Sequence, residues 1–317
     1  MERIFGLKKV AGFPRPIVTL GVFDGVHRGH SLVLREAIRW AKQVGGTSVV
    51  ITFDRHPDAV LNRRAAAAIT SLEHRLVLIE KAGIAVAVVL HFDRALAEME
   101  PEDFAREIFA NRLHAAGVLL GFNTRFGRSA RGDAALLAST GAKCGFEVRT
   151  VRPLLVDGAP VSSTLIRNLI TAGDLDKAAR FLGRPVSLRG TVVHGDHRGK
   201  SLGFPTANLN LHHEVTPPAG VYVCRVRLDG DSYWGLANIG VRPTFHNEGR
   251  PLRRVVEVYI DGYAPAGSLY GKTLEAEILR LLRPEWKFDS PEALVAQMEN
   301  DRRSLHAFRD SQPPPGT

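Results

Sequence analysis

Residues 17–30 read IVTLGVFDGVHRGH, and this stretch sets the fold of the first half of the chain. Residues 17–23 form an apolar run that is typical of a buried strand. A helix is expected over 31–42, because Leu34, Ile38 and Ala41 recur at helical spacing. Strand, glycine-containing turn and helix together predict the opening unit of an α/β domain.

The same alternation continues to residue 151. Apolar runs predict strands at 49–53, 85–90, 117–121 and 147–151, and helical patterns predict helices at 72–82, from 101, and at 134–144. Thr70-Ser71-Leu72-Glu73 has the spacing of a capping box before the helix 72–82. The alternation predicts a Rossmann-like parallel sheet with helices on both faces, whose ligands bind beyond the carboxyl ends of the strands.

The pattern changes after Gly183-Arg184-Pro185. Before this point, 162–182 holds two short helices that are broken at Gly173-Asp174. After it, turns rich in Gly, Pro and Asp separate strand-like runs at 186–193, 220–228, 232–239, 255–260 and 274–281. These runs predict a small all-β barrel, with a closing helix at 291–302. We expect an N-terminal domain over 1–184, a barrel domain over 185–311 and a disordered tail over 312–317.

Composition limits the class of protein. The chain has 317 residues, 44% hydrophobic and 24% charged, which is enough apolar material for two cores. Its only cysteines, Cys144 and Cys224, exclude a disulfide framework and a cysteine-rich zinc site. The N-terminus does not read as a signal peptide, and no apolar run reaches about 18 residues. We therefore expect a cytoplasmic protein without a membrane-spanning segment.

The net charge of +9 leaves two interpretations open. A basic protein can bind nucleic acid by neutralising phosphates, and this non-enzyme alternative predicts salt-sensitive binding to DNA or RNA. The positive charges are scattered rather than gathered in runs, and no basic stretch is interleaved with aromatic residues. We therefore expect an enzyme with polyphosphate substrates and no nucleic-acid partner, present as a monomer or a weak oligomer.

The turn at 21–30 has the features of a phosphate site. His27 and His30 form an H-x-G-H motif at a helix start, where free backbone N–H groups and the helix dipole attract anions. Gly25 and Gly29 allow a ligand to approach the backbone closely. Both imidazoles can donate hydrogen bonds to a nucleotide phosphate during transfer, which favours nucleotidylyl transfer from ATP over a polar helix cap. The residues expected to bind ATP here are Gly21, Phe23, Asp24 and Gly29.

Residues 195–208, GDHRGKSLGFPTAN, are similar to a P-loop, but they are one residue too short and lie in an all-β region. We reject the P-loop interpretation and expect a flap that covers polyphosphate through its backbone N–H groups. The flap residues expected to bind phosphate are Gly195, Arg198, Gly199, Lys200 and Gly203. Thr206 and Asn208 lie two residues apart in an extended segment, so both point to one face and suit one Mg²⁺.

From about residue 17 to 302 the chain resembles the bacterial bifunctional riboflavin kinase/FAD synthetase family. In the first half, the matching segments are FDRHP at 53–57, GFNTRFG at 121–127 and VSSTLIR at 161–167. The resemblance implies that Asn123 contacts the flavin or nucleotide. It also implies a second phosphate clamp made of Ser162, Ser163, Thr164 and Arg167. Phe122 stands where an acidic residue is common in the family, and Thr124 where Phe is common.

The second half resembles the riboflavin kinase part of this family. The matching segments include LGFPTAN at 202–208, ANIGVRPTF at 237–245 and LYGK at 269–272. The resemblance implies that Thr206 and Asn208 hold the metal, that Arg242 contacts flavin, and that Glu257 accepts the proton of the riboflavin 5′-hydroxyl. The segment VYIDGY at 258–263 departs from the family's T-H-x-L-D-F.

The resemblance implies one chain with two ATP sites, ATP as co-substrate and Mg²⁺ as cofactor. The barrel would phosphorylate riboflavin to FMN, and the N-terminal domain would transfer AMP from ATP to FMN, giving FAD and pyrophosphate. Two alternatives stay open within enzymes: only one activity is retained, or the adenylyl group goes to another acceptor.

Overall fold

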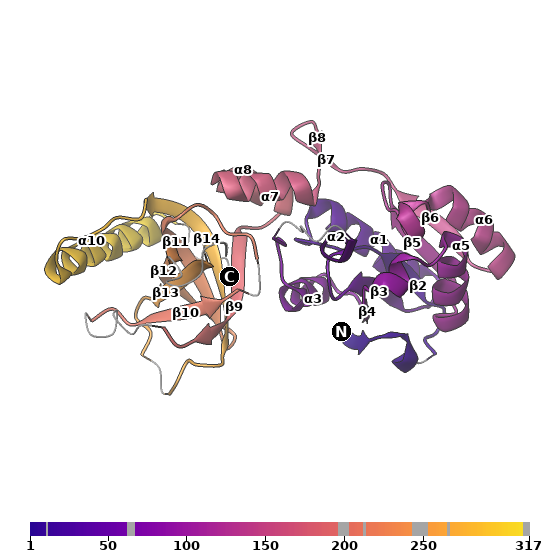
Figure 1. Cartoon of the computed structure of the whole chain (residues 1–317), viewed down its shortest axis with the longest axis horizontal. Coiled ribbons are helices and arrows are strands. Elements are labelled where there is room, and N and C mark those ends of the chain that lie inside the picture. Colours follow the sequence, from indigo (N-terminus) through magenta and orange to yellow (C-terminus); the bar gives the residue numbers. More distant parts are fainter. Residues whose placement is uncertain are drawn as a thin grey trace. The chain divides into compact units, whose positions relative to one another are not determined.

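The computed structural model describes residues 1–10, 12–61, 67–195, 203–211, 214–242, 253–264 and 267–312 (Figure 1). The chain divides into two compact units. The first consists of Met1–Ile166 with Phe181–Gly183, and the second of Arg167–Arg180 with Arg184–Thr317. The functional boundary expected at residue 184 stays a prediction, and the tail beyond residue 312 lies outside the described residues.

The first unit is built on a six-stranded parallel sheet with the strand order β1-β4-β3-β2-β5-β6. Its strands are β1 (Glu2–Phe5), β2 (Ile17–Leu20), β3 (Ser48–Phe53), β4 (Val86–Leu90), β5 (Gly117–Gly121) and β6 (Glu147–Val151). The predicted parallel sheet is confirmed. The sequence did not reveal β1, because a four-residue strand that contains Glu2 and Arg3 shows no apolar run.

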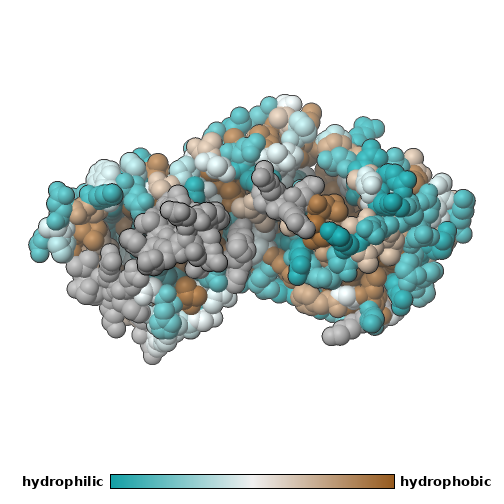
Figure 2. Space-filling view, in the orientation of Figure 1, coloured by the Kyte–Doolittle hydropathy of each residue, from teal (hydrophilic) through white to brown (hydrophobic). Residues whose placement is uncertain are grey.

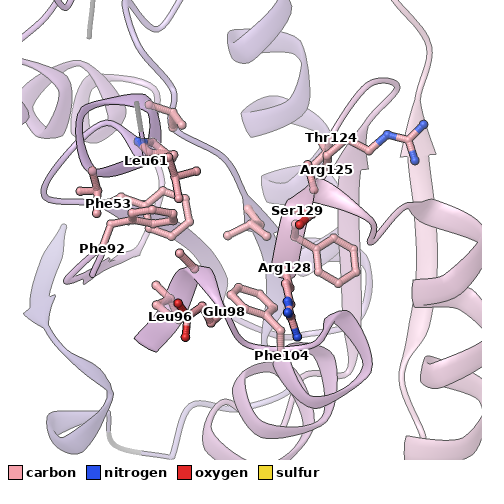
Figure 3. A pocket seen from close by; sticks show the side chains of 18 of the residues that line it. Phe53, Leu61, Phe92, Leu96, Glu98, Phe104, Thr124, Arg125, Arg128 and Ser129 are labelled. Carbon is pink, nitrogen blue, oxygen red and sulfur yellow. The ribbon is translucent and has the colours of Figure 1, made fainter. Parts of the chain in front are cut away.

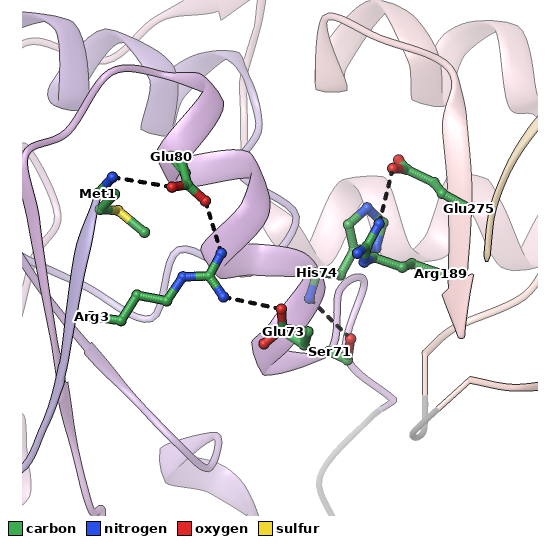
Figure 4. A network of polar contacts seen from close by, with 8 residues as sticks. All are labelled: Met1, Arg3, Ser71, Glu73, His74, Glu80, Arg189 and Glu275. Atoms are coloured by element: carbon green, nitrogen blue, oxygen red, sulfur yellow. Dashed lines mark hydrogen bonds and ion pairs between the residues drawn. The ribbon is translucent and has the colours of Figure 1, made fainter. Parts of the chain in front are cut away.

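Ion pairs anchor β1 to helix α3 (Leu72–Lys81) (Figure 4). Arg3 donates to Glu73 Oε1 at 3.0 Å and to Glu80 Oε2 at 2.8 Å, while the amino group of Met1 lies 3.1 Å from Glu80 Oε1. The capping box expected before α3 is wrong in detail. Ser71, not Thr70, caps the helix, since its Oγ accepts the His74 N–H at 3.3 Å.

Helices cover both faces of this sheet, as predicted (Figure 1). They are α1 (Arg28–Gln43), α2 (Pro57–Leu61), α3 (Leu72–Lys81), α4 (Arg94–Ala97), α5 (Pro101–Phe104) continued by a π-helical stretch (Ala105–Arg112), and α6 (Ala134–Cys144). On one face, Trp40 of α1 packs with Ile17 and Leu119. On the other face, Phe109 packs with Val18. The core therefore holds the sheet between two helical layers.

Strand β6 forms one edge of the sheet and is largely exposed. Arg149 Nε lies 2.7 Å from Glu147 Oε1, and the Arg149 guanidinium lies 4.0 Å from the centroid of the Trp40 ring. The edge thus carries a charge pair that is held against an aromatic side chain.

On the visible face of the first unit, hydrophilic residues surround smaller hydrophobic patches (Figure 2).

The second unit contains a closed antiparallel barrel in the order β10-β13-β12-β11-β14-β9. Its strands are β9 (Val186–Val193), β10 (Thr206–Asn210), β11 (Gly220–Leu228), β12 (Asp231–Arg242), β13 (Arg253–Ile260) and β14 (Thr273–Arg283). The predicted barrel is confirmed. Strand β10 completes it, and the polar sequence TANLN explains why it was not recognised as a strand.

Helix α10 (Pro291–Asp310) closes this unit and is longer than the predicted 291–302. The extension is stabilised because Leu305 is fully buried and Phe308 packs against the Trp234 ring. The remaining elements are β7 (Leu155–Val156), β8 (Ala159–Pro160), α7 (Ser163–Ala172) and α8 (Leu175–Leu182). As predicted, the two helices are separated at Gly173, which has a φ of 83°. Of the helices that the structure describes, none is both long and apolar enough to span a membrane.

Candidate active sites

The turn between β2 and α1 has an unusual backbone. Phe23 and Val26 have φ values of 54° and 38°, a left-handed conformation that side chains disfavour and that tends to occur at functional sites. The buried carboxylate of Asp24 holds the turn, since its Oδ1 accepts the N–H groups of Ile69 at 2.8 Å and Thr70 at 3.1 Å. Asp24 does not line a described cavity, so its visible role is to position the turn.

The two histidines stack at the start of α1. Their ring centroids lie 3.5 Å apart with an angle of 15° between the planes. His27 is the N-cap, and its Nδ1 accepts the backbone N–H of His30 at 3.2 Å. Because Nδ1 is an acceptor, a neutral His27 carries its proton on Nε2. A Cβ on Gly29 would lie 3.2 Å from the His27 ring, so a side chain at residue 29 would crowd the capping imidazole.

The surroundings of His30 disfavour its protonated, charged form. Burial, followed by the nearby His27 and Arg75, holds the pKa of His30 well below its usual value of 6.5. Its Nδ1 is buried and has no hydrogen-bond partner within the described part of the chain. A neutral imidazole with an unsatisfied nitrogen can bind a ligand atom without first losing another contact.

A cavity of about 270 Å³ opens over these residues, and it is called the polar cavity below because its lining includes two histidines and several serines and threonines. The predicted site residues that line it are Gly21, Phe23, His27, Gly29, His30, Asn123, Ser162, Ser163 and Thr164. The starts of α1 and α7 both border it, which supplies backbone N–H donors from two helices. Ser163 Oγ donates to the Asp24 carbonyl at 2.9 Å, so the start of α7 is joined to the turn that precedes α1. Arg167 follows on α7 but is not among the lining residues.

Beside it lies a larger, mainly apolar cavity of about 550 Å³ (Figure 3). The two cavities share Leu20, Gly21 and Thr124. Its aromatic lining residues are Phe53, Phe92, Phe104 and Phe126, and its polar ones include Glu98, Arg128 and Ser129. The side chain of Arg125 points away from the cavity toward Asp133, 3.1 Å away (Figure 3).

The sequence did not identify this apolar cavity. Phe53 and Phe126 lie inside two of the quoted family segments, which was the available signal. Phe92 and Phe104 come from other parts of the chain and meet them only in the fold, where Phe53 and Phe92 pack edge to face at 5.3 Å.

The barrel holds a cavity of about 370 Å³. Thr206, Asn238, Glu257 and Tyr259 line it from the barrel strands, and Trp286, Phe288 and residues of α10 line it from the C-terminal segment. The strand register places Glu257 directly opposite Asn208 on β10 and Asn238 on β12. Directly opposed residues point to the same face of a sheet, so the carboxylate stands between two amides.

Asn208 is packed against the start of the predicted flap. A Cβ on Gly195 would lie 2.2 Å from Asn208 Nδ2, so a side chain at residue 195 would displace this amide. Gly203 has a φ of 83° in the turn before β10, a conformation that suits glycine. Arg198, Gly199 and Lys200 lie outside the described residues, and Arg242 is described only by its backbone at the end of β12.

Comparison with known proteins gives two family matches. The FAD synthetase family matches residues 13–165, and the riboflavin kinase family matches residues 182–308. Two similar relatives are proteins named bifunctional riboflavin kinase/FMN adenylyltransferase. The one from Listeria monocytogenes is 36% identical, with 92% of each chain covered. The one from Haemophilus influenzae is 35% identical, covering 93% of this chain and 94% of that protein.

A solved structure has a similar fold over nearly the whole chain. It is described as a macrolide-efflux protein from Streptococcus pneumoniae, and its TM-score is 0.82 at 29% identity. The similarity covers 96% of this chain and 99% of that one.

Proposed function

Because the chain belongs to the family of bifunctional riboflavin kinases/FMN adenylyltransferases, we propose that its cavities divide the two reactions between them. The enzyme phosphorylates riboflavin to FMN with ATP, and it adenylylates FMN to FAD with release of pyrophosphate. In the proposal, the two cavities of the first unit carry out adenylyl transfer. The barrel cavity carries out the kinase reaction.

Adenylyl transfer needs an FMN phosphate oxygen in line with the α-phosphorus of ATP. The polar cavity, with its two helix starts, suits the triphosphate. The apolar cavity, with its four phenylalanines, suits the isoalloxazine ring. The observation that carries this assignment is the shared wall of Leu20, Gly21 and Thr124, which would bring the two substrates together.

In this arrangement the histidines act on the phosphates. His27 would donate through Nε2–H, because its Nδ1 accepts the backbone N–H of the helix cap. The Nδ1 of His30, which has no hydrogen-bond partner among the described residues, would form a hydrogen bond with a phosphate oxygen. Both donors are fixed before the reaction, so they stabilise negative charge as pyrophosphate leaves without costly reorganisation.

The kinase reaction would use Glu257 as the general base. Its carboxylate accepts the proton of the riboflavin 5′-hydroxyl as that oxygen attacks the γ-phosphorus of ATP. Thr206 lines the cavity together with Glu257; Asn208 is not among the lining residues but lies directly opposite Glu257 in the strand register. Both side chains would offer Mg²⁺ the neutral oxygen ligands that it accepts. When bound, Mg²⁺ neutralises charge on the phosphates. Gly195, Arg198, Gly199, Lys200 and Gly203 would cover the ATP phosphates.

The other proposed contacts complete the two sites. Asn123 at the rim of the polar cavity, and Arg242 in the second unit, would contact flavin, and Arg167 would bind phosphate together with Ser162, Ser163 and Thr164. We also propose that the enzyme works in the cytoplasm as a monomer or weak oligomer, without a nucleic-acid partner. Light scattering during gel filtration, with and without added RNA, would test the last two points.

The division of labour is tested by product analysis. The protein is incubated with Mg²⁺, ATP and either riboflavin or FMN, and the flavins are separated by chromatography. Thr206→Ala should abolish FMN formation and leave FAD formation from supplied FMN unchanged. His27→Ala should do the opposite. If either variant lost both activities while folded, the two reactions would share one site and the proposal would fail.

A further inference from the structure

A buried ion pair lies in one wall of the barrel cavity. Arg283, at the end of β14, donates through Nε to both carboxylate oxygens of Asp301, at 3.0 and 3.1 Å, and through Nη2 to Oδ2 at 2.8 Å. The side chains are only 9% and 6% exposed. Gln297 adds a further donor to Asp301 Oδ1 at 2.8 Å. Both charges are thus removed from water and closely matched.

The pair joins three pieces of chain. Arg283 ends β14, Asp301 and Gln297 belong to α10, and Nη1 of Arg283 donates to the carbonyl of Pro284 at 3.2 Å in the connecting segment. The pair therefore ties the connecting segment and α10 to the end of β14, while His306 and Asp261 join α10 to the barrel further along the helix, at 2.8 Å.

The guanidinium also supports two aromatic rings. Its Cζ lies 4.8 Å from the centroid of Trp286 and 5.6 Å from that of Phe288, distances at which a cation is attracted to a ring. Both rings, Arg283 and Asp301 line the cavity that also contains Thr206 and Glu257. Trp286 is 49% exposed, so one side of it is supported by the cation and the rest is accessible.

We propose that Arg283 and Asp301 are positioning residues for the riboflavin kinase reaction, which hold the Trp286–Phe288 wall against the isoalloxazine ring of riboflavin. The inference rests on the proposed function, since it takes the barrel cavity as the riboflavin site. The pair does not contact the reacting atoms in this scheme, so it sets the affinity for flavin rather than the rate of phosphoryl transfer.

The chemistry of the pair favours positioning over stability alone. Burying two charges costs about as much as their attraction returns, and well-packed apolar residues stabilise such positions equally well or better. An apolar pair cannot reproduce what Arg283 provides to the wall, namely a planar cation beneath two rings with its direction fixed by a carboxylate. The role in binding and the role in folding can therefore be separated by mutation.

Steady-state kinetics of FMN formation tests the proposal. Arg283→Lys replaces the planar guanidinium, and Asp301→Asn removes the charge that fixes its direction. Each should raise the KM for riboflavin about tenfold, the size of one misplaced cation–aromatic contact, with kcat and the KM for ATP nearly unchanged. The double variant Arg283→Met/Asp301→Leu should regain the thermal stability of the barrel but keep the raised KM. Arg303→Met, an exposed arginine on the same helix, is the matched control and should behave as wild type.

The experiments distinguish a failure of the positioning role of Arg283 and Asp301 from a failure of the barrel cavity as the riboflavin site. FAD formation from supplied FMN should be unchanged in every variant. A wild-type KM in the single variants, a fall in kcat alone, or recovery of KM in the double variant would each overturn the positioning role. Leu294→Trp fills the same cavity from α10. If Leu294→Trp left the KM for riboflavin unchanged, the cavity would not be the riboflavin site, and the proposed function itself would fail.

Discussion

Replacing Gly195 by alanine should disable the kinase reaction through a single contact. The φ of Gly195 lies outside the left-handed range, so alanine meets no strain in φ there. Its Cβ would lie 2.2 Å from Nδ2 and 2.4 Å from Cγ of Asn208. Strand β10 is hydrogen-bonded on both sides, to β9 and β13, so its backbone cannot easily move away. The Asn208 side chain must therefore rotate out of place.

The displacement can be worked out from these distances. Moving Nδ2 from 2.2 Å to the 3.4 Å of an ordinary contact requires a shift of about 1.2 Å. A misplacement of about 1 Å in a catalytic site can cost about 100-fold in rate. We expect kcat for FMN formation to fall by about that factor, while FAD formation from supplied FMN is unchanged.

The assay is chromatography of flavins from timed reactions started with riboflavin or with FMN. Gly267→Ala is the matched control, because a Cβ at that glycine would meet nothing within 4 Å. Wild-type kinase turnover in Gly195→Ala would refute the reasoning, since it would show either that the flap yields instead or that Asn208 does not serve the reaction.

Three further predictions concern the two proposed reactions. His30→Ala should slow FAD synthesis by about 100- to 1,000-fold, as expected when one charge-stabilising donor is removed, and FMN formation from riboflavin serves as the internal control. Glu257→Gln should lower kinase kcat by about 100-fold or more with ATP affinity retained; equal losses of both would argue against a base. The NMR titration midpoint of the His30 ring should lie below pH 6.5. Because the folded-state pKa is depressed, the stabilising contribution of neutral His30 is complete above pH 6.5 and lost as the pH falls below it, and a midpoint at or above 6.5 would contradict this environment.

The strands of the fold could be predicted from the sequence where their apolar runs were continuous. The central strands of the parallel sheet are buried on both faces, so β3 (SVVITF) and β4 (VAVVL) are dominated by Val, Ile and Leu without an alternating polar pattern. Strands β1 and β10 were missed for the opposite reason. They are short and polar, and they become strands because a neighbouring strand offers hydrogen bonds, which no local pattern records.

The site was predictable to the extent that its residues are close together in the chain. His27, Gly29 and His30 lie in one turn, and the structure brings them into one cavity with Ser162. The apolar cavity beside them is assembled from side chains separated by tens of residues, so its shape depends on the packing of whole elements. Asp24 shows another limit, because its carboxylate binds the backbone of residues 69–70, which only the fold brings near.

The two large sheets of this enzyme differ in how they avoid exposing an unpaired strand edge to other chains. The barrel closes on itself, so each of its strands has two neighbours and no backbone edge is offered to another chain. The parallel sheet stays open, and β6 forms one of its two edges. The Glu147–Arg149 pair, whose guanidinium lies over the Trp40 ring, places charge along that edge, where a second strand would have to dock. A foreign strand would have to displace or desolvate these charges, so the pair protects the sheet from growing beyond its own chain.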